Sequence, residues 1–203
     1  MKLYMAPGSC TTGLHILLEE LELPFEAWII SIPAGENRKP EYLALNPKGS
    51  IPTLVLDDGQ TLTDYVAISY WLACRHPRAR LLPADPLAAA RVMELLVYVV
   101  ATVHGQGFAR LFNAEGFQVQ GEAGEALRDQ GREIVGKAFA ILDTQLAEGY
   151  AAGSFSIADP ALFYVEFWAD KLGIPLPPKL ATHYARMRER PVVQRVLREE
   201  GYR

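Results

Sequence analysis

The chain has few cysteines, no membrane-length apolar run and no excess of basic residues. Its two cysteines, Cys10 and Cys74, are too few for the disulfide scaffold of a small secreted domain. No apolar run reaches the roughly 18 residues of a membrane span, and the N-terminal MKLYMAPGSC lacks the apolar stretch of a signal peptide. The 20 Lys and Arg are outnumbered by 24 Asp and Glu, which argues against a general nucleic-acid binder. These absences predict a protein of the reducing cytosol with no membrane or nucleic-acid partner.

Histidine is also scarce. The four His are scattered along the chain, and no Cys and His residues cluster with the spacing of zinc ligands, so the sequence predicts no metal site. Apolar residues, in contrast, are abundant. Half of the 203 residues are hydrophobic and 22% are charged, which is the composition of a globular protein. This length suits one large domain or two small ones.

Residues 1–76 alternate between strand-like and helix-like patterns. Aromatic and β-branched runs indicate strands, and apolar residues at helical spacing indicate helices. The expected strands are residues 2–5, 25–32, 53–56 and 60–63, and the expected helices are residues 13–22, 41–45 and the segment after residue 64. The predicted order is therefore β-α-β-α-β-β-α, which makes this half an α/β domain.

Residues 77–87 contain three prolines and no periodicity, as is typical of an interdomain linker. Beyond them we find only helical patterns, which predict an all-helical domain over residues 88–203. The expected helices are residues 88–112, 126–146, 156–171, 180–189 and 192–199. In the first of these, Gly105 and Gly107 predict a kink or an end. Residues 156–171 are apolar nearly all round, which predicts a buried central helix.

Cys10 is the most informative single residue. It follows a predicted strand and a Pro-Gly turn, and it lies at or just before the start of a helix. Backbone N–H groups at a helix N-terminus favour a thiolate, which can attack a disulfide or pair with another thiol. A small buried apolar residue would fit the same position equally well. Cys74 lies on an apolar helix, where we expect it in the core.

Four other positions combine a polar group with a special backbone environment. Pro52 precedes a strand, and an ordinary trans turn proline is favoured because only about 5–6% of X–Pro bonds are cis. Asp64 and Tyr65 begin a helix, so Asp64 can cap the helix or bind an ammonium, and the free N–H groups can bind a carboxylate. Ser156 and Asp159 have the S-x-x-D spacing of a capping box, which predicts a structural role.

His104 lies inside an apolar helical pattern. A histidine there is more often a hydrogen-bonded packing residue than a proton carrier. Because imidazole titrates near neutral pH, His104 remains a candidate base or hydrogen-bond donor.

Short motifs spread over the whole chain add a different kind of signal. In the first half they are Met1-Lys2-Leu3-Tyr4, Pro7-Gly8-Ser9-Cys10, His15, Asn46-Pro47-Lys48-Gly49, Pro52 and Leu62-Thr63-Asp64. In the second half they are Leu82-Pro83-Ala84-Asp85-Pro86, Val103-His104, Leu111-Phe112, Phe155-Ser156-Ile157-Ala158-Asp159 and Arg190-Pro191. Together they resemble the glutathione transferase family, and most of all its bacterial beta class.

The resemblance implies a thioredoxin-like N-terminal domain followed by an all-α C-terminal domain. It implies an enzyme of detoxification that conjugates glutathione to small hydrophobic electrophiles. Glutathione would be a co-substrate, with no further cofactor, and the protein would be a cytoplasmic homodimer.

The resemblance also implies a glutathione site. Cys10 and His104 would be its catalytic residues and would contact the glutathione sulfur. Pro52 matches the cis-proline of the family, and the backbone of Ile51 would pair with the cysteinyl part of glutathione. The γ-glutamyl ammonium and carboxylate would bind at the helix start formed by Asp64 and Tyr65.

The chain departs from the family pattern at several of these places. The family usually has Glu-Ser where this chain has Asp64-Tyr65, an Asn where it has Val97, and a Lys in the loop where only Arg38 and Lys39 are nearby. The group that activates the thiol is therefore open between Cys10, His104 and the hydroxyls of Thr11 and Thr12. Two alternative functions also stay open. One is a monothiol disulfide reductase acting through Cys10, and the other is a non-catalytic glutathione-binding protein.

Overall fold

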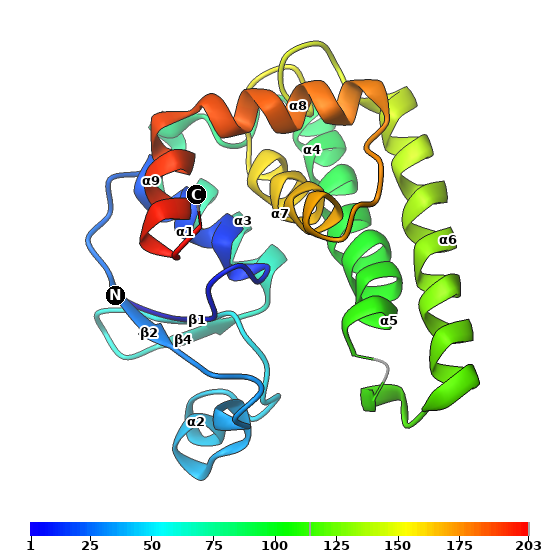
Figure 1. Cartoon of the computed structure of the whole chain (residues 1–203). Coiled ribbons are helices and arrows are strands. Elements are labelled where there is room, and N and C mark those ends of the chain that lie inside the picture. The colour runs from blue at the N-terminus through cyan, green and yellow to red at the C-terminus, as the bar shows by residue number, and fades with distance from the viewer. Residues whose placement is uncertain (114, 203) are drawn as a thin grey trace. The chain divides into compact units, whose positions relative to one another are not determined.

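A computed structural model describes residues 1–113 and 115–202, and the chain divides into two compact units (Figure 1). Unit 1 comprises Met1–Leu82 together with Arg188–Arg203, and unit 2 comprises Pro83–Met187. The sequence interpretation assigns residues 188–203 to the helical domain, whereas the structure groups them with the α/β part. Each unit has its own buried core and is described by itself.

Unit 1 is built on a four-stranded sheet in the order β2-β1-β3-β4. The strands are β1 (Lys2–Met5), β2 (Glu26–Ile29), β3 (Thr53–Val55) and β4 (Thr61–Thr63). β1 and β2 run parallel and are joined through helix α1 (Thr11–Glu20), because a parallel pair needs a crossover. β3 pairs antiparallel with both β1 and β4. The thioredoxin-like order β-α-β-α-β-β-α predicted for this half is thus present.

The remaining helical segments of unit 1 are short, apart from α3. They are η1 (Glu36–Arg38), α2 (Pro40–Leu45), α3 (Tyr65–Arg75) and η2 (Pro77–Ala79). α1 contacts α3, and its Leu14, Leu17 and Leu18 are fully buried with Leu3 of β1. Each such leucine contributes about 1.5–3 kcal/mol through burial, so the apolar face of α1 fixes this helix in the core.

The strand register brings three loops to one edge of the sheet. Tyr4 of β1 is opposite Thr53 of β3, and Thr53 is opposite Thr63 of β4. Because β1 and β4 end at this edge while β3 begins there, three segments meet. They are the loop after β1, the residues just before β3 and the residues just after β4.

Helix α9 (Pro191–Glu199) completes unit 1 by packing on α1 (Figure 1). Its buried side chains are Val193, Val196 and Leu197, which form one apolar stripe. Arg190 holds the start of the helix through a 2.6 Å contact between its Nη2 and Oε1 of Glu20. This apolar stripe and its ion pair explain why the C-terminal segment belongs to unit 1.

Unit 2 is all-helical, as the sequence predicts. Its elements are α4 (Pro86–Tyr98), the π-helix η3 (Val99–Phe108), α5 (Ala109–Phe112), η4 (Glu115–Phe117), α6 (Gly121–Gln145), α7 (Ala158–Lys171) and α8 (Pro178–Glu189). η3 contacts α4, α6 and α7. Residues 158–169 of α7 are all buried, which confirms the prediction of a buried helix there.

Two glycines allow η3 and α6 to approach closely. A Cβ on Gly107 would lie 2.6 Å from Cγ2 of Val135, and a Cβ on Gly131 would lie 2.9 Å from the carbonyl oxygen of Gly107. The sequence predicted a kink or an end at Gly105 and Gly107. The helix does not end there but continues to Phe112, and the π-helical stretch Val99–Phe108 contains both glycines, with Gly107 serving the packing against α6.

The helical stretch Pro86–Phe112 corrects the expectation that no apolar segment has the length of a membrane span. Its 27 residues have a mean hydropathy of 1.7 in the most apolar window, which is enough to span a membrane by length and composition. Core helices of globular proteins have the same length and composition, and this stretch contacts α6 and α7 within unit 2.

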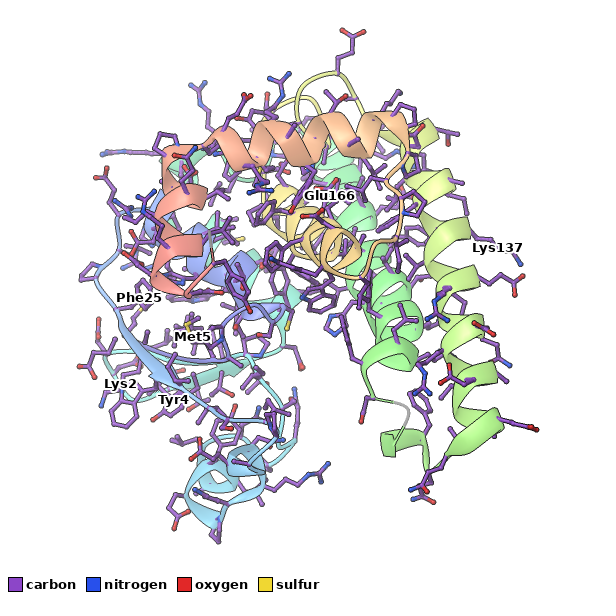
Figure 2. All side chains as sticks on the ribbon, viewed as in Figure 1. Lys2, Tyr4, Met5, Phe25, Lys137 and Glu166 are labelled. Carbon is purple, nitrogen blue, oxygen red and sulfur yellow. The ribbon has the colours of Figure 1, made fainter. Side chains whose placement is uncertain are left out.

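The start of α7 is held by a network of buried polar groups. Oδ2 of Asp159 accepts hydrogen bonds from the backbone N–H and the hydroxyl of Ser156, at 2.7 and 2.9 Å. Oδ1 of Asp159 accepts from the N–H of Ala151 at 2.7 Å and lies 3.1 Å from Nε2 of His183. The other ring nitrogen of His183 lies 2.8 Å from Oε2 of Glu166, which Figure 2 labels on α7. The sequence indicated the Ser156–Asp159 pair but neither Glu166 nor His183.

Candidate functional site

Cys10 lies at the sheet edge where the three loops of unit 1 meet. It occupies the N-cap position of α1, and its side chain is only 6% exposed. Burial raises the pKa of its thiol to about 12, although hydrogen bonds with its own N–H, with Ser9 and with the N–H of Thr11 act to lower it. Desolvation therefore outweighs the helix N-terminus and favours the neutral thiol, which fits the alternative of a small buried residue at this position. A neutral thiol still has one S–H to donate.

The hydroxyls of Thr11 and Thr12 are committed to the protein itself. Thr11 Oγ1 donates to the carbonyl of Ala6 at 3.0 Å and accepts from the N–H of Ala6 at 3.2 Å. Thr12 Oγ1 donates to Oε2 of Glu200 at 2.6 Å, and both threonines are fully buried. Their protons therefore fix the loop that carries Cys10 and are not presented to a ligand.

The peptide bond between Ile51 and Pro52 is cis. The residues alone favoured an ordinary trans proline, which is wrong, and the family resemblance implied the cis form. The loop before this bond is held through the carbonyl of Ser50, which accepts from Oη of Tyr42 at 2.7 Å and from Nδ2 of Asn46 at 2.7 Å. Pro52 is buried and Ile51 is half-buried at the start of β3.

Asp64 stands at the start of α3 but does not cap it. Its backbone has a φ of 71°, and its side chain turns to Nζ of Lys48 instead of to the first N–H groups of α3. Nζ of Lys48 also donates to Oγ1 of Thr63 at 2.8 Å. The interpretation of Asp64 as a plain N-cap is therefore wrong.

Tyr65 follows Asp64 and turns its ring into the core, where it is 3% exposed. Burial raises the pKa of its phenol well above the usual value, and the charge of Cys10 acts in the same direction. The sequence analysis assigned Tyr65 only a backbone role, and nothing in its pattern indicated that its ring would be buried.

His104 lies in η3 of unit 2. Its Nδ1 is 3.2 Å from Oη of Tyr164, and its ring packs edge-on against Trp168 with centroids 4.9 Å apart. Burial lowers the pKa of His104 to about 4, so the ring is neutral at pH 7. It can donate or accept a hydrogen bond, and it is too weak a base to be protonated near neutrality.

Aromatic rings cluster beside His104 in unit 2. Trp168 packs against Phe108 and Phe112, with centroids 5.3 and 5.2 Å apart. Phe108 is fully buried, which makes it a core residue, whereas Phe112 is 54% exposed. Phe112 therefore offers an apolar surface at the end of α5.

Cys74 is exposed, so the prediction that it lies in the core is wrong. The buried positions of α3 are residues 65, 68, 69, 72 and 73. Cys74 lies one turn after Tyr70, which is 50% exposed. Both residues are therefore on the face of α3 opposite to its buried positions. The pattern of α3 is apolar on both faces, and the sequence alone could not distinguish them.

Of the residues predicted for the site, unit 1 brings Cys10, Ile51, Pro52, Asp64 and Tyr65 to one sheet edge. The sixth, His104, belongs to unit 2. Two nearby cations of unit 1 are already engaged, since Lys39 Nζ lies 3.2 Å from Oε1 of Glu36 and Lys48 contacts Asp64. The arrangement is suited to an extended ligand with a carboxylate, an ammonium and a thiol.

Comparisons with known proteins find family models and relatives that match the chain. Two family models match the chain: "Glutathione S-transferase, N-terminal domain" over residues 8–75 and "Glutathione S-transferase, C-terminal domain" over residues 125–189. A protein named glutathione S-transferase GstA from Escherichia coli O157:H7 is 35% identical over 208 residues, covering 99% of both chains. A maleylacetoacetate isomerase from Pseudomonas aeruginosa is 32% identical over 181 residues, covering 87% of this chain and 84% of that protein.

Solved structures give the same result. A glutathione transferase homolog from Sulfitobacter with bound glutathione has a TM-score of 0.89 at 31% identity, covering 98% of this chain and 97% of that one. A bacterial beta class glutathione S-transferase from Sphingomonas chungbukensis has a TM-score of 0.85 at 31% identity, covering 99% of each chain.

Proposed function

The chain belongs to the glutathione S-transferase family, and on that premise we propose that it conjugates glutathione to small hydrophobic electrophiles. The thiolate sulfur of glutathione attacks an electrophilic carbon. A new S–C bond forms, and the leaving group departs with its electron pair. The protein binds the tripeptide in unit 1 and keeps its sulfur ionised.

The observation that carries the proposal is the convergence of three loops at one edge of the sheet. They follow β1, precede β3 and follow β4. The pairing of Tyr4 with Thr53 and of Thr53 with Thr63 brings these loops to the same edge. Three adjacent strands span two interstrand spacings, or about 9.6 Å. A tripeptide in an extended conformation is about 10 Å long. Glutathione can therefore lie across these three strands and contact all three loops.

Each loop has a role in this binding mode. The N–H groups at the start of α3, including that of Tyr65, bind the γ-glutamyl carboxylate, and Asp64 binds the ammonium. The backbone of Ile51, next to Pro52, pairs with the cysteinyl residue. Cys10 donates its S–H to the glutathione sulfur.

Because Cys10 is neutral, its thiol stabilises a neighbouring thiolate through a hydrogen bond and lowers the pKa of the glutathione thiol. The same neutrality disfavours the alternative reaction, in which Cys10 itself attacks a disulfide, because only a thiolate is an effective nucleophile. Conjugation is therefore the function that the geometry supports best.

The test measures conjugation of glutathione to 1-chloro-2,4-dinitrobenzene for the wild-type protein and two Cys10 variants. Cys10→Ser keeps a donor and retains most of the activity, whereas Cys10→Ala removes the donor. Because a hydrogen bond to a charged group is worth about 1.5–3 kcal/mol, Cys10→Ala lowers kcat/KM roughly 10- to 100-fold. Cys74→Ala is the matched control and leaves the rate unchanged.

Two results would contradict the proposal. Failure to bind immobilised glutathione, with no turnover of any halogenated nitroarene, would leave only the fold. Reduction of a glutathione mixed disulfide that disappears in both Cys10 variants, without conjugation, would favour the reductase function instead.

Assembly and cellular role complete the proposal. We infer a homodimer, because Leu87 and Val97 of α4 expose apolar side chains, 67% and 45% accessible, in a family of dimeric enzymes. A cytoplasmic location is supported by two free cysteines, Cys10 and Cys74. Detoxification is the role that fits conjugation of apolar electrophiles. Light scattering on the purified protein at micromolar concentration tests the dimer.

A further inference from the structure

A second group of ionisable side chains lies where α9 packs on α1. His15 and Glu19 are four residues apart on α1, so they share one face of that helix. The end of α9 adds Glu199, and Glu200 follows it. One ligand atom each from His15, Glu19 and Glu199 lies within 4.8 Å of the other two. The function proposed above uses none of these residues.

The hydrogen bonds around His15 determine which ring nitrogen carries the proton. Oε2 of Glu200 accepts from the N–H of Gly8 at 2.7 Å and from the hydroxyl of Thr12 at 2.6 Å. Glu200 therefore acts as a hydrogen-bond acceptor, and its Oε1 lies 2.9 Å from Nδ1 of His15. In the neutral ring the proton sits on Nδ1, and Nε2 presents a lone pair.

That lone pair faces another acceptor. Nε2 of His15 lies 3.2 Å from Oε2 of Glu199. A lone pair and a carboxylate oxygen repel each other at this distance unless a cation lies between them. The cation is either a proton or a metal ion.

The geometry points to a metal ion: we propose that His15, Glu19 and Glu199 bind one divalent transition-metal cation, of which Zn²⁺ is the representative. Zn–N and Zn–O distances of about 2.0–2.2 Å in tetrahedral geometry place two ligand atoms roughly 3.3 Å apart. The 3.2 Å between Nε2 of His15 and Oε2 of Glu199 is close to this value, and the ligand atom of Glu19 lies within 4.8 Å of both. A carboxylate that holds the other nitrogen of a ligating histidine, as Glu200 does, is the usual outer partner in such sites.

The charge of the pocket favours the cation further. Glu19, Glu199 and Glu200 bring three negative charges to a pocket of about 340 Å³. Among the residues that the structure describes, no Lys or Arg lines this pocket, and Arg195 reaches Glu19 from outside it. Apolar side chains, among them Met5 and Phe25 (Figure 2), form the rest of the wall and lower the local dielectric constant.

The ligand set also selects the kind of metal. Ca²⁺ and Mg²⁺ prefer oxygen ligands throughout, whereas imidazole together with carboxylates suits Zn²⁺ and its first-row neighbours. Three protein ligands leave one tetrahedral position for water. A bound ion would join α9 to α1 and, through Glu200, would fix the segment from Gly8 to Thr12.

The experiment uses the full-length protein in a Cys74→Ala background, because an exposed thiol also binds Zn²⁺. After treatment with a chelator, calorimetry measures the binding of Zn²⁺, and absorption spectroscopy measures the binding of Co²⁺. We expect one ion per chain and a tetrahedral Co²⁺ spectrum. Glu199→Gln, at an exposed position, weakens Zn²⁺ binding at least tenfold. Glu122→Gln, an exposed carboxylate on α6, is the matched control and leaves the affinity unchanged.

A further variant distinguishes the metal from a shared proton. Arg195→Gln frees Glu19 and therefore tightens Zn²⁺ binding several-fold, whereas it does nothing for a proton between His15 and Glu199. Failure of Zn²⁺ and Co²⁺ to bind at millimolar concentration would overturn the proposal and leave an ion pair. Binding that Glu199→Gln leaves unchanged would also overturn it. Neither result depends on the glutathione site, which conjugation assays test separately.

Discussion

In unit 2, Nδ1 of His183 lies 2.8 Å from Oε2 of Glu166, and both side chains are buried. Nε2 of the same ring lies 3.1 Å from Oδ1 of Asp159, so one imidazole joins two carboxylates of α7 to α8. Replacement by His183→Ala leaves two buried carboxylates without their cation. We expect the free energy of unfolding, measured by urea titration, to fall by about 3–5 kcal/mol. Arg132→Ala, which removes an exposed ion pair on α6, should change it little.

The same triad makes stability depend on pH. Burial alone would lower the pKa of His183, but the charges of Glu166 and Asp159 raise it to about 10. Between the unfolded value near 6.5 and about 10, the folded state binds the proton that the unfolded state has lost, so stability falls as pH rises. Unfolding free energies measured from pH 6.5 to 10 should decline in the wild-type protein. This decline should be smaller in His183→Gln, and an equal slope in both proteins would contradict the assignment.

The capping residue Ser156 offers a milder test. Its N–H and hydroxyl both donate to Asp159, and the hydroxyl oxygen also accepts from the N–H of Ala158 at 3.3 Å. Ser156→Ala removes the two side-chain bonds and keeps the backbone one. We expect a loss of about 1 kcal/mol in denaturant unfolding. Ser154→Ala, an exposed serine two residues earlier, provides the control and should have no effect.

The two cysteines should differ sharply in reactivity. Cys74 is exposed, whereas burial raises the pKa of Cys10 to about 12 from a usual value of 9.0. A shift of three units reduces the thiolate fraction of Cys10 about 1000-fold near pH 8. Mass spectrometry after iodoacetamide treatment should find Cys74 modified first and Cys10 only after unfolding. Rapid alkylation of Cys10 in the folded Cys74→Ala variant would refute the neutral thiol.

His104 should make the stability of the protein fall at acid pH. Burial lowers its pKa to about 4, so between pH 6.5 and 4 only the unfolded chain gains a proton there, and stability falls as pH falls. Relative to His104→Gln, the wild-type protein should lose up to about 3 kcal/mol over this interval. Denaturant unfolding at several pH values measures the difference. If His104 titrates near 6.5 by NMR in the folded protein, this expectation fails.

The order of elements in both units could be predicted from local pattern. β1 has the predicted bounds because the Pro7-Gly8 turn ends it, and α7 was recognised from its apolar residues on every face. Gly107 marks the limit of that approach. Its role is set by Val135 of α6, nearly thirty residues away, so the sequence around it suggests a break in a helix that continues.

The sequence predicted where the residues of the candidate site lie better than it predicted their protonation and their partners. The positions of Cys10 and Asp64 followed from helix starts, but the protonation state of the Cys10 thiol depends on its burial. The pairing of Asp64 with Lys48 depends on a loop 16 residues earlier. The cluster of His15 with Glu199 lies beyond any local pattern, because its ligands are more than 180 residues apart.

The row of paired residues Tyr4, Thr53 and Thr63 has a consequence for the tolerance of unit 1 to insertions and deletions. Side chains on a strand alternate between faces, so sliding β3 by one position along β1 would turn Leu54 out of the core and Pro52 away from its partners. Removing a single residue between α2 and β3 would therefore disrupt both the proposed glutathione-binding edge of the sheet and the hydrophobic core of unit 1. Length variation should be tolerated instead in the Asp57-Asp58-Gly59 hairpin, at the far end of the same strands.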